Sequence, residues 1–309
     1  MEIKDYGEKL RSRELKVALK IHSDSRKFFS DFLRAKGFIE IPPVIISSVT
    51  DPLNHPTEKA LISAGGFSYE LTKSMIFHKQ MVLNTYDKIF AFSPNIRLEE
   101  TQKKLTGRHL LEFTQIDLEV KNATREDILR LGEEMFIYAV KNIKEVDGDL
   151  LDSVGRVLKE PQAPFERITY GEAYEKYGDE FENKLSSEKS FPFWIIDIPV
   201  GQREFYDRED RDRPGILVDY DLVYPEGFGE ALSGGEREHE IERIIERIER
   251  KGEKTEQFTY YIEFVRNFGL PPSAGFGIGI ERFVRFVIGA KRIEDIVPFP
   301  KAPGEFYPI

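Results

Sequence analysis

The sequence predicts a mixed α/β (α+β) fold, and three observations carry that prediction. A glycine-alternating strand over residues 275–280 runs directly into an amphipathic helix. Two strand-like stretches, 88–96 and 109–120, are joined by a short charged loop, as in an antiparallel pair. Segments with helical periodicity, 6–36 and 124–143, stand between the strands. We therefore expect an antiparallel sheet flanked by helices.

The composition narrows the functional classes. The 309 residues are 40% apolar, which is enough for one large core or two modest ones. The absence of cysteine excludes a disulfide framework, a thiol nucleophile and a Cys-ligated metal site, and it favours a reducing cytoplasm. No apolar run has the length of a signal peptide core or a membrane span. We expect neither export nor membrane insertion.

The charge balance is acidic, with a formal net charge of −10. Proteins that bind nucleic acid normally concentrate basic residues on one surface, because they must neutralise phosphates. The overall balance therefore speaks against transfer RNA as a partner, although a local basic patch is compatible with it.

The glycine-alternating strand predicts a close approach to a ligand. Gly275, Gly277 and Gly279 alternate with apolar residues, so one face of this strand has no side chains. Arg282 follows at the junction of strand and helix. A flat base on the glycine face and a guanidinium group against a phosphate would suit a nucleotide.

Three stretches resemble the motifs of the class II aminoacyl-tRNA synthetases, most closely the aspartyl and asparaginyl branch. GFGIGIER, at 275–282, resembles motif 3, and the stretch 92–120, which begins FSPNIRLEE, resembles motif 2. The long helix 6–36 followed by F-I-E-I-P resembles motif 1, which implies a homodimer. The resemblance covers nearly the whole chain and implies the class II fold for residues 1–309 as a single catalytic domain.

The resemblance implies a site for ATP. Arg97 and Arg282 would be the catalytic arginines, with Arg97 touching both the α-phosphate and the reacting carboxylate. Such a fork lowers the repulsion between two anions brought together for adenylation. The remaining ATP contacts implied are Glu99 toward the adenine and ribose, Arg108 or His109 on the outer phosphates, Phe113 stacked on the adenine, and Gly279.

The resemblance also implies a site for the amino acid and for magnesium. Lys79 and Arg237 would hold the side chain of aspartate, and Asp117 its α-amino group. The further candidate amino-acid contacts are Gly275 and Glu58. A pocket with two cations favours a carboxylate side chain and disfavours lysine. Magnesium bound to ATP would be held by Glu230 and Ser233, since this ion prefers oxygen ligands shared with phosphates, with Asp219 and Asp221 adding negative charge nearby.

Two segments have no assigned chemistry. Residues 147–190 are expected to form a charged, helix-rich insertion with a covering role. Residues 203–213 contain several arginines and are expected to form a solvated, mobile loop. No oligonucleotide-binding barrel precedes the core, so we expect the anticodon-binding domain of the aspartyl and asparaginyl enzymes to be missing.

These features together resemble the archaeal asparagine synthetases that are related to aspartyl- and asparaginyl-tRNA synthetases. By that resemblance, L-aspartate and ATP would form aspartyl-adenylate, and free ammonia would then displace AMP to give asparagine. Whether Lys79 and Arg237 hold the α- or the β-carboxylate stays open. One alternative is a truncated synthetase that loads transfer RNA or another acceptor. A second is a non-catalytic dimer that senses an amino acid or a nucleotide.

Overall fold

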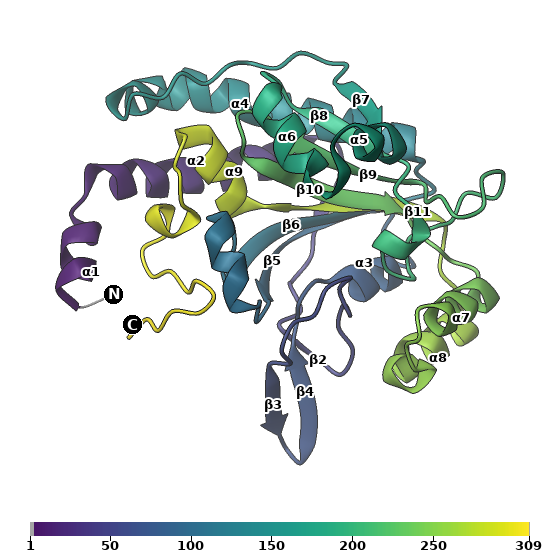
Figure 1. Cartoon of the computed structure of the whole chain (residues 1–309). Coiled ribbons are helices and arrows are strands. Elements are labelled where there is room, and N and C mark those ends of the chain that lie inside the picture. The colour runs from purple at the N-terminus through teal and green to yellow at the C-terminus, as the bar shows by residue number, and fades with distance from the viewer. Residues whose placement is uncertain (1–2, 309) are drawn as a thin grey trace.

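The computed structural model describes residues 3–308 and is built on a central eight-stranded sheet (Figure 1). Its strands in spatial order are β1 (Ile39–Glu40), β5 (Lys88–Ile96), β6 (Glu112–Lys121), β11 (Ser273–Gly279), β10 (Gly229–Glu236), β9 (Asp219–Tyr224), β8 (Phe193–Ile196) and β7 (Glu166–Thr169). The interior pairs are antiparallel, and the two edge pairs, β1 with β5 and β7 with β8, are parallel. The predicted mixed α/β fold is confirmed, with parallel edges that the sequence did not indicate.

One face of the sheet is closed by helices. α2 (Arg13–Ala35), α4 (Arg125–Ser153) and α9 (Ile280–Ile288) share the main hydrophobic core with the strands. The rings of Phe29 and Phe283 meet at 4.8 Å between centroids, and those of Phe136 and Phe283 at 5.8 Å. Such aromatic contacts bury large apolar areas, and so this face is packed and leaves the opposite face for a ligand.

The main helices begin where local sequence signals place them. The Ser12 side chain accepts a hydrogen bond from Leu15 N at the start of α2. Thr124 and Asp127 form a complete capping box at the start of α4. α4 then runs ten residues past the expected end at Ile143, with a non-helical residue at Asp147.

The remaining elements lie around the other face and the edges of the sheet (Figure 1). The helices are α1 (Ile3–Leu10), α3 (Ile76–Val82), α5 (Tyr170–Tyr177), α6 (Phe181–Glu188), α7 (Ile241–Arg250) and α8 (Thr259–Phe268). A small sheet contains β2 (Ile46–Ser47), β4 (Phe67–Leu71) and β3 (Leu61–Ala64). Short 3-10 turns are η1 (Thr101–Thr106), η2 (Gly178–Glu180), η3 (Val200–Gln202), η4 (Thr255–Phe258) and η5 (Ile293–Ile296). Within residues 3–308, no helix combines the length and the apolar character needed to cross a bilayer.

Two segments differ from their expected roles. The 147–190 segment is part of the main sheet, since it supplies the edge strand β7 as well as α5 and α6. The arginine-rich 203–213 segment is held by backbone bridges, one from Asp207 to Arg237 and one from Glu209 to Leu217. Both are therefore built into the fold, because strand pairing and not charge density decides their position.

Candidate active site

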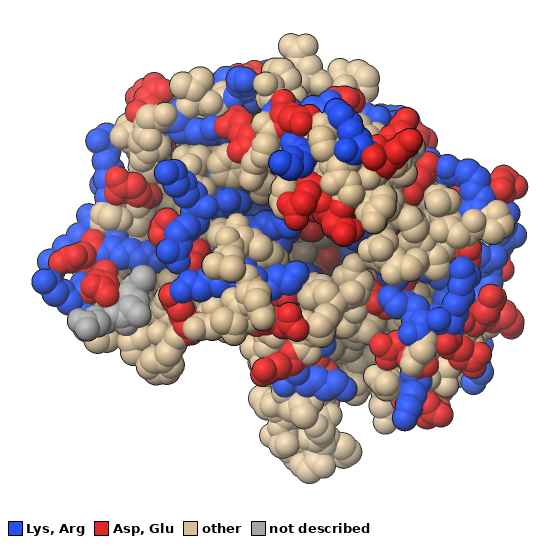
Figure 2. Space-filling view, in the orientation of Figure 1, with Lys and Arg blue, Asp and Glu red and all other residues tan. Residues whose placement is uncertain are grey.

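A cavity of about 250 Å³ opens on the uncovered face of the sheet. Its walls come from β6, β10, β11, α3 and the 51–55 and 203–207 segments. A smaller cavity of about 40 Å³ adjoins it and shares Arg97 and Arg282 with it. Figure 2 shows a hollow near the centre of the view with both acidic and basic side chains at its rim. The cavities form one continuous binding region.

The residues predicted to bind ATP all line this region. Phe113 and Gly279 line the smaller cavity but not the larger one. The set shared by both cavities is Arg97, Glu99, Arg108, His109 and Arg282. The smaller cavity thus combines an aromatic ring, a glycine and three arginines, as a purine nucleotide would require.

Arg97 lies at the end of β5 with its head group largely uncommitted. Its Nε donates to the carbonyl oxygen of Lys73 at 3.1 Å, and its guanidinium carbon lies 5.2 Å from the centre of the Phe113 ring. Its two terminal nitrogens have no hydrogen-bond partner within residues 3–308. They are therefore available to an anion.

Arg282 and Glu230 are paired with each other. Arg282 NH1 donates to Glu230 Oε1 at 3.0 Å, and Arg282 Nε donates to the Arg108 carbonyl oxygen at 3.3 Å. Burial works to raise the pKa of Glu230, but Arg282 and Arg108 outweigh it and the pKa is lowered. Glu230 is thus an ionised carboxylate in the cavity.

The predicted magnesium ligands do not form a complete site by themselves. Within residues 3–308 no cluster of three or more His, Cys, Asp or Glu side chains could hold a metal ion. Glu230 and Ser233 both line the larger cavity, and Ser233 hydrogen-bonds Asp221. Their oxygen donors fit magnesium when phosphate oxygens supply the remaining ligands.

Arg108 and His109 have partners that the sequence did not indicate. Arg108 forms an ion pair with Glu182 of α6, so the 147–190 segment reaches the active site. The His109 imidazole lies 2.5 Å from the Thr106 hydroxyl oxygen. Burial, together with Arg282 and Arg108, lowers the pKa of His109 to about 2. His109 is therefore a neutral imidazole at physiological pH.

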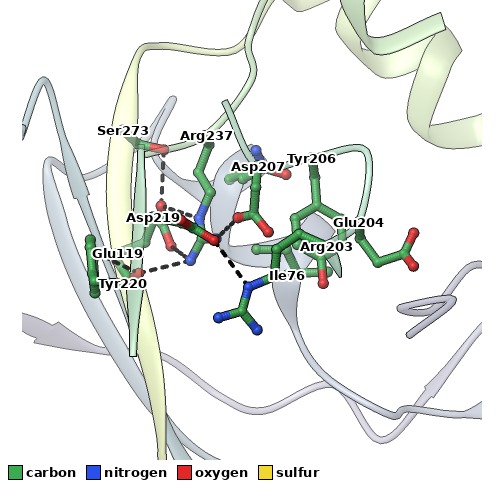
Figure 3. Close-up of polar contacts among 12 residues, drawn as sticks. Ile76, Glu119, Arg203, Glu204, Tyr206, Asp207, Asp219, Tyr220, Arg237 and Ser273 are labelled. Atoms are coloured by element: carbon green, nitrogen blue, oxygen red, sulfur yellow. Dashed lines mark hydrogen bonds and ion pairs between the residues drawn. The ribbon is translucent and has the colours of Figure 1, made fainter. Parts of the chain in front are cut away.

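The amino-acid end of the cavity contains the predicted cations, but they are already paired, and Figure 3 shows Arg237 beside Glu119 and Asp207. Lys79 Nζ lies 3.2 Å from Glu119 Oε2 and 3.3 Å from Asp117 Oδ1. Arg237 donates from Nε to Glu119 Oε1 at 3.1 Å and from NH1 to Asp207 Oδ1 at 2.6 Å. The two cations of the predicted pocket are thus compensated by carboxylates, as buried charges in proteins usually are.

Asp117 has one free carboxylate oxygen. Oδ1 faces Lys79, whereas Oδ2 is buried without a hydrogen-bond partner in the described part of the chain. Asp117 lines the larger cavity. A buried acceptor without a donor is unfavourable, so this oxygen is suited to receive an ammonium group.

Two predicted contacts are not brought to the cavity. Glu58 is exposed, and its backbone N–H donates to the Leu98 carbonyl oxygen at 3.1 Å. Gly275 lies behind the cavity, where its carbonyl oxygen accepts from Arg237 NH2 at 2.8 Å. A side chain at Gly275 would collide with Glu119, so protein groups and not a ligand approach this glycine.

Sequence reasoning missed Arg203, which lines the larger cavity. Its Nε lies 3.0 Å from Asp219 Oδ2 and its NH2 lies 2.6 Å from Asp221 Oδ1. Burial raises the pKa of Asp219 to about 7 and that of Asp221 to about 6. The only signal in the sequence was the alternation of charged and aromatic residues in Arg203-Glu204-Phe205-Tyr206-Asp207.

Comparison with known proteins matches the chain to one enzyme family. Residues 4–303 match the family described as tRNA synthetases class II (D, K and N). The asparagine–tRNA ligase of Symbiobacterium thermophilum is 29% identical, over 97% of this chain and 72% of that protein. The aspartate–tRNA(Asp/Asn) ligase of Sulfurisphaera tokodaii is 31% identical, over 94% of this chain and 70% of that protein.

A solved structure agrees with these matches. The asparaginyl-tRNA synthetase of Pyrococcus horikoshii, complexed with asparaginyl-adenylate, superposes with a TM-score of 0.89 at 25% identity. The match covers 97% of this chain and 71% of that one.

These matches correct two expectations from the sequence. Ammonia-dependent asparagine synthesis is contradicted, because the similar proteins are named as ligases of transfer RNA. The expectation that transfer RNA is not a partner is contradicted for the same reason. Both errors have a physical origin: residues that activate an amino acid do not reveal its acceptor, and the net charge of a chain does not describe one local surface.

Proposed function

The chain belongs to the class II tRNA synthetases (D, K and N), and on that premise we propose that it activates aspartate or asparagine with ATP and transfers it to transfer RNA. The enzyme is a ligase of this family. One observation carries the proposal: the uncommitted Arg97 guanidinium lies in the region shared by the two cavities. That is where a carboxylate and an α-phosphate would have to meet.

In the first step, a carboxylate oxygen of the amino acid attacks the α-phosphorus of ATP in line, and pyrophosphate leaves with the electron pair of the broken bond. Arg97 would contact both anions and stabilise the charge that grows on the phosphoryl oxygens. Arg282 would hold the polyphosphate, and Phe113 would stack on the adenine. Asp117 would orient the amino acid by accepting from its ammonium group through Oδ2.

In the second step, a terminal ribose hydroxyl of transfer RNA attacks the carbonyl carbon of the adenylate. An ester bond forms as the hydroxyl gives up its proton, the bond from carbonyl carbon to phosphate oxygen breaks, and AMP leaves with that proton on its phosphate. Glu230 and Ser233 would hold magnesium, which neutralises phosphate charge when bound. Glu230 would then exchange its contact with Arg282 for the ion.

A homodimer is part of the proposal. Ile39 of the edge strand β1 and the nearby Ile45 and Ile46 are 43%, 49% and 42% exposed. Apolar side chains beside an unpaired strand edge favour burial against a second copy. Sedimentation velocity would show a species of twice the mass of the 35.8 kDa chain, whereas a concentration-independent monomer would contradict it.

Pyrophosphate exchange is the first test. The protein is incubated with ATP, magnesium and labelled pyrophosphate, with aspartate or asparagine as the second substrate. We expect exchange that depends on one of these amino acids. Transfer is then measured as labelled amino acid retained on acid-precipitated transfer RNA from an archaeal and a bacterial source.

The variant Arg97→Gln tests the proposed role of Arg97 in the first step. Since Arg97 makes one hydrogen bond to the protein, we expect an unchanged fold and exchange slower by about 10²- to 10³-fold. Arg211→Gln, at a side chain that is 57% exposed and pairs with Glu240, is the control. Exchange with neither amino acid would overturn the proposal, and exchange without charging of any transfer RNA would overturn its second step.

A further inference from the structure

Arg203 is a third cation at the amino-acid end of the larger cavity. It follows the turn η3, and its head group is fixed by two carboxylates of β9, Asp219 and Asp221, at 3.0 and 2.6 Å. Asp219 is itself fixed, because its Oδ1 accepts from Ile198 N at 2.9 Å. Figure 3 shows the Asp207 and Asp219 carboxylates between the head groups of Arg237 and Arg203. The guanidinium group is therefore held rigidly.

The hydrogen-bond inventory separates Arg203 from the other two cations of this end. Lys79 has three donors and three acceptors in place, namely Asp117, Glu119 and the Leu118 carbonyl oxygen. Every nitrogen of Arg237 also has an acceptor. In Arg203, Nε donates to Asp219 and NH2 forms an ion pair with Asp221 without a hydrogen bond, whereas NH1 has no partner among residues 3–308. NH1 is thus a charged donor without an acceptor on a residue that lines the cavity.

The register of the sheet places Arg203 away from the adenine end of the binding region. Asp219 pairs with Gly235 and Asp221 with Ser233, so Arg203 lies beside the middle of β10. It lines the larger cavity but not the smaller one, which contains Phe113 and Gly279. This position fits a contact to the amino acid and not to the adenine.

The order of strands across the sheet assigns the part of the amino acid that reaches Arg203. Arg97 follows β5, Asp117 lies on the neighbouring β6, and the carboxylates that hold Arg203 lie on β9, three strand spacings or about 14 Å beyond β6. When the α-carboxylate of the bound amino acid faces Arg97 and its ammonium group faces Asp117, the side chain of that amino acid points toward β9. Arg203 and Asp117 line the same cavity, so the side chain of a bound amino acid would face the Arg203 head group.

We propose that Arg203 binds the side-chain oxygen of the substrate amino acid through NH1, and this rests on the function proposed above. The oxygen is a carboxylate oxygen in aspartate and the amide carbonyl oxygen in asparagine. Both accept from a guanidinium N–H, and the charged carboxylate forms the stronger bond. Arg203 thereby adds a specificity contact that the motifs of the family did not indicate in this sequence.

The experiment compares Arg203→Lys and Arg203→Gln with the wild type in pyrophosphate exchange. We expect KM for the amino acid to rise by about 10- to 100-fold, more for aspartate than for asparagine. KM for ATP should stay within about twofold of the wild-type value, because Arg203 does not line the smaller cavity, where the adenine is expected. Arg208→Gln is the control, because Arg208 lies five residues away, pairs with Glu236 and does not line the cavity.

Loss of Arg203 leaves the buried Asp219 and the half-buried Asp221 without their shared partner, which destabilises the fold of the single variants. Arg203→Gln/Asp219→Asn removes one of these charges and keeps the shape of the acceptor for Ile198 N. Thermal unfolding monitors the fold of each variant. Calorimetric titration with aspartate and with asparagine then measures binding without any need for catalysis.

The outcomes separate the two proposals. Absence of exchange in the wild type would overturn the proposed function, while the titrations would still decide on Arg203. A folded double variant that binds both amino acids within about twofold of the wild type would overturn the role of Arg203. An equal rise in KM for ATP would overturn it as well, because Arg203 would then serve the phosphates.

Discussion

Arg282 donates to Glu230 at 3.0 Å, so the arginine predicted for phosphate and the carboxylate predicted for magnesium neutralise each other in the absence of ligands. Binding of ATP with magnesium would supply a new partner to each. The pair can therefore separate without leaving a buried charge alone, which is the condition under which exchange of partners is favourable.

Replacement of Glu230 tests that relationship. We expect Glu230→Gln to weaken the activation of pyrophosphate exchange by magnesium by about 10- to 100-fold, because an amide is a poorer ligand than a carboxylate. Titration with magnesium at fixed ATP measures it. Glu188→Gln, at the exposed end of α6, is the control. An unchanged magnesium dependence in Glu230→Gln would remove Glu230 from the metal site.

Glu119 is fully buried and pairs with both Lys79 and Arg237. We expect Glu119→Gln to lower the free energy of unfolding by about 3–5 kcal/mol, because two buried cations would lose a shared counter-charge. Urea unfolding measures the change. Glu134→Gln breaks only a pair with Lys36 in which both side chains are more than 40% exposed, and no measurable change is expected. Equal free energies of unfolding for Glu119→Gln and Glu134→Gln would show that Glu119 does not stabilise the fold through Lys79 and Arg237.

The buried carboxyl group of Glu204 should make the free energy of unfolding depend on pH. Its Oε1 lies 2.6 Å from Lys251 Nζ, and its Oε2 is buried without a partner in the described structure. Burial, the largest effect, raises the pKa of Glu204 from 4.5 to about 7. The folded state therefore holds this proton more tightly than the unfolded state does, so the stabilisation is complete below pH 4.5 and is lost as the pH rises through about 7.

The measurement compares the wild type with Glu204→Gln, which carries no charge at any pH. Between pH 4.5 and 8 we expect the wild type to lose about 3 kcal/mol of stability relative to this variant. Glu126→Gln, on an exposed part of α4, should follow the wild-type curve. Parallel curves for the wild type and Glu204→Gln would mean that Glu204 titrates at its ordinary pKa.

Two glycines of β11 should respond differently to alanine. A Cβ at Gly275 would overlap the Leu118 carbonyl oxygen and the Glu119 carboxylate, whereas at Gly279 the nearest atom, of Arg282, lies 3.8 Å away. We expect Gly275→Ala to lower the melting temperature, and Gly279→Ala to keep it but to raise KM for ATP, because Gly279 lines the nucleotide cavity. A stable Gly275→Ala protein would show that β6 can move away from β11.

Much of the fold could be predicted from local patterns. The strand Lys88–Ile96 has the bounds predicted for it, and α4 begins at Arg125, one residue after the predicted start of the helix 124–143. Gly37 has the left-handed φ of 83° expected after the C-cap of α2. Caps, turns and periodicity act over a few residues, and so a single sequence contains them in full.

The sequence by itself also determined the family and most residues of the nucleotide site, because the motif 2 and motif 3 stretches are short and continuous. The tertiary structure alone decided how the charges are paired. Lys79, Glu119 and Arg237 come from α3, from β6 and from the end of β10, and they meet because of the register of the sheet. Arg203 reaches the cavity, and Glu182 reaches Arg108 at its wall, by long-range packing in the same way. Charge compensation in a buried site depends on distances between remote segments, which no local pattern contains.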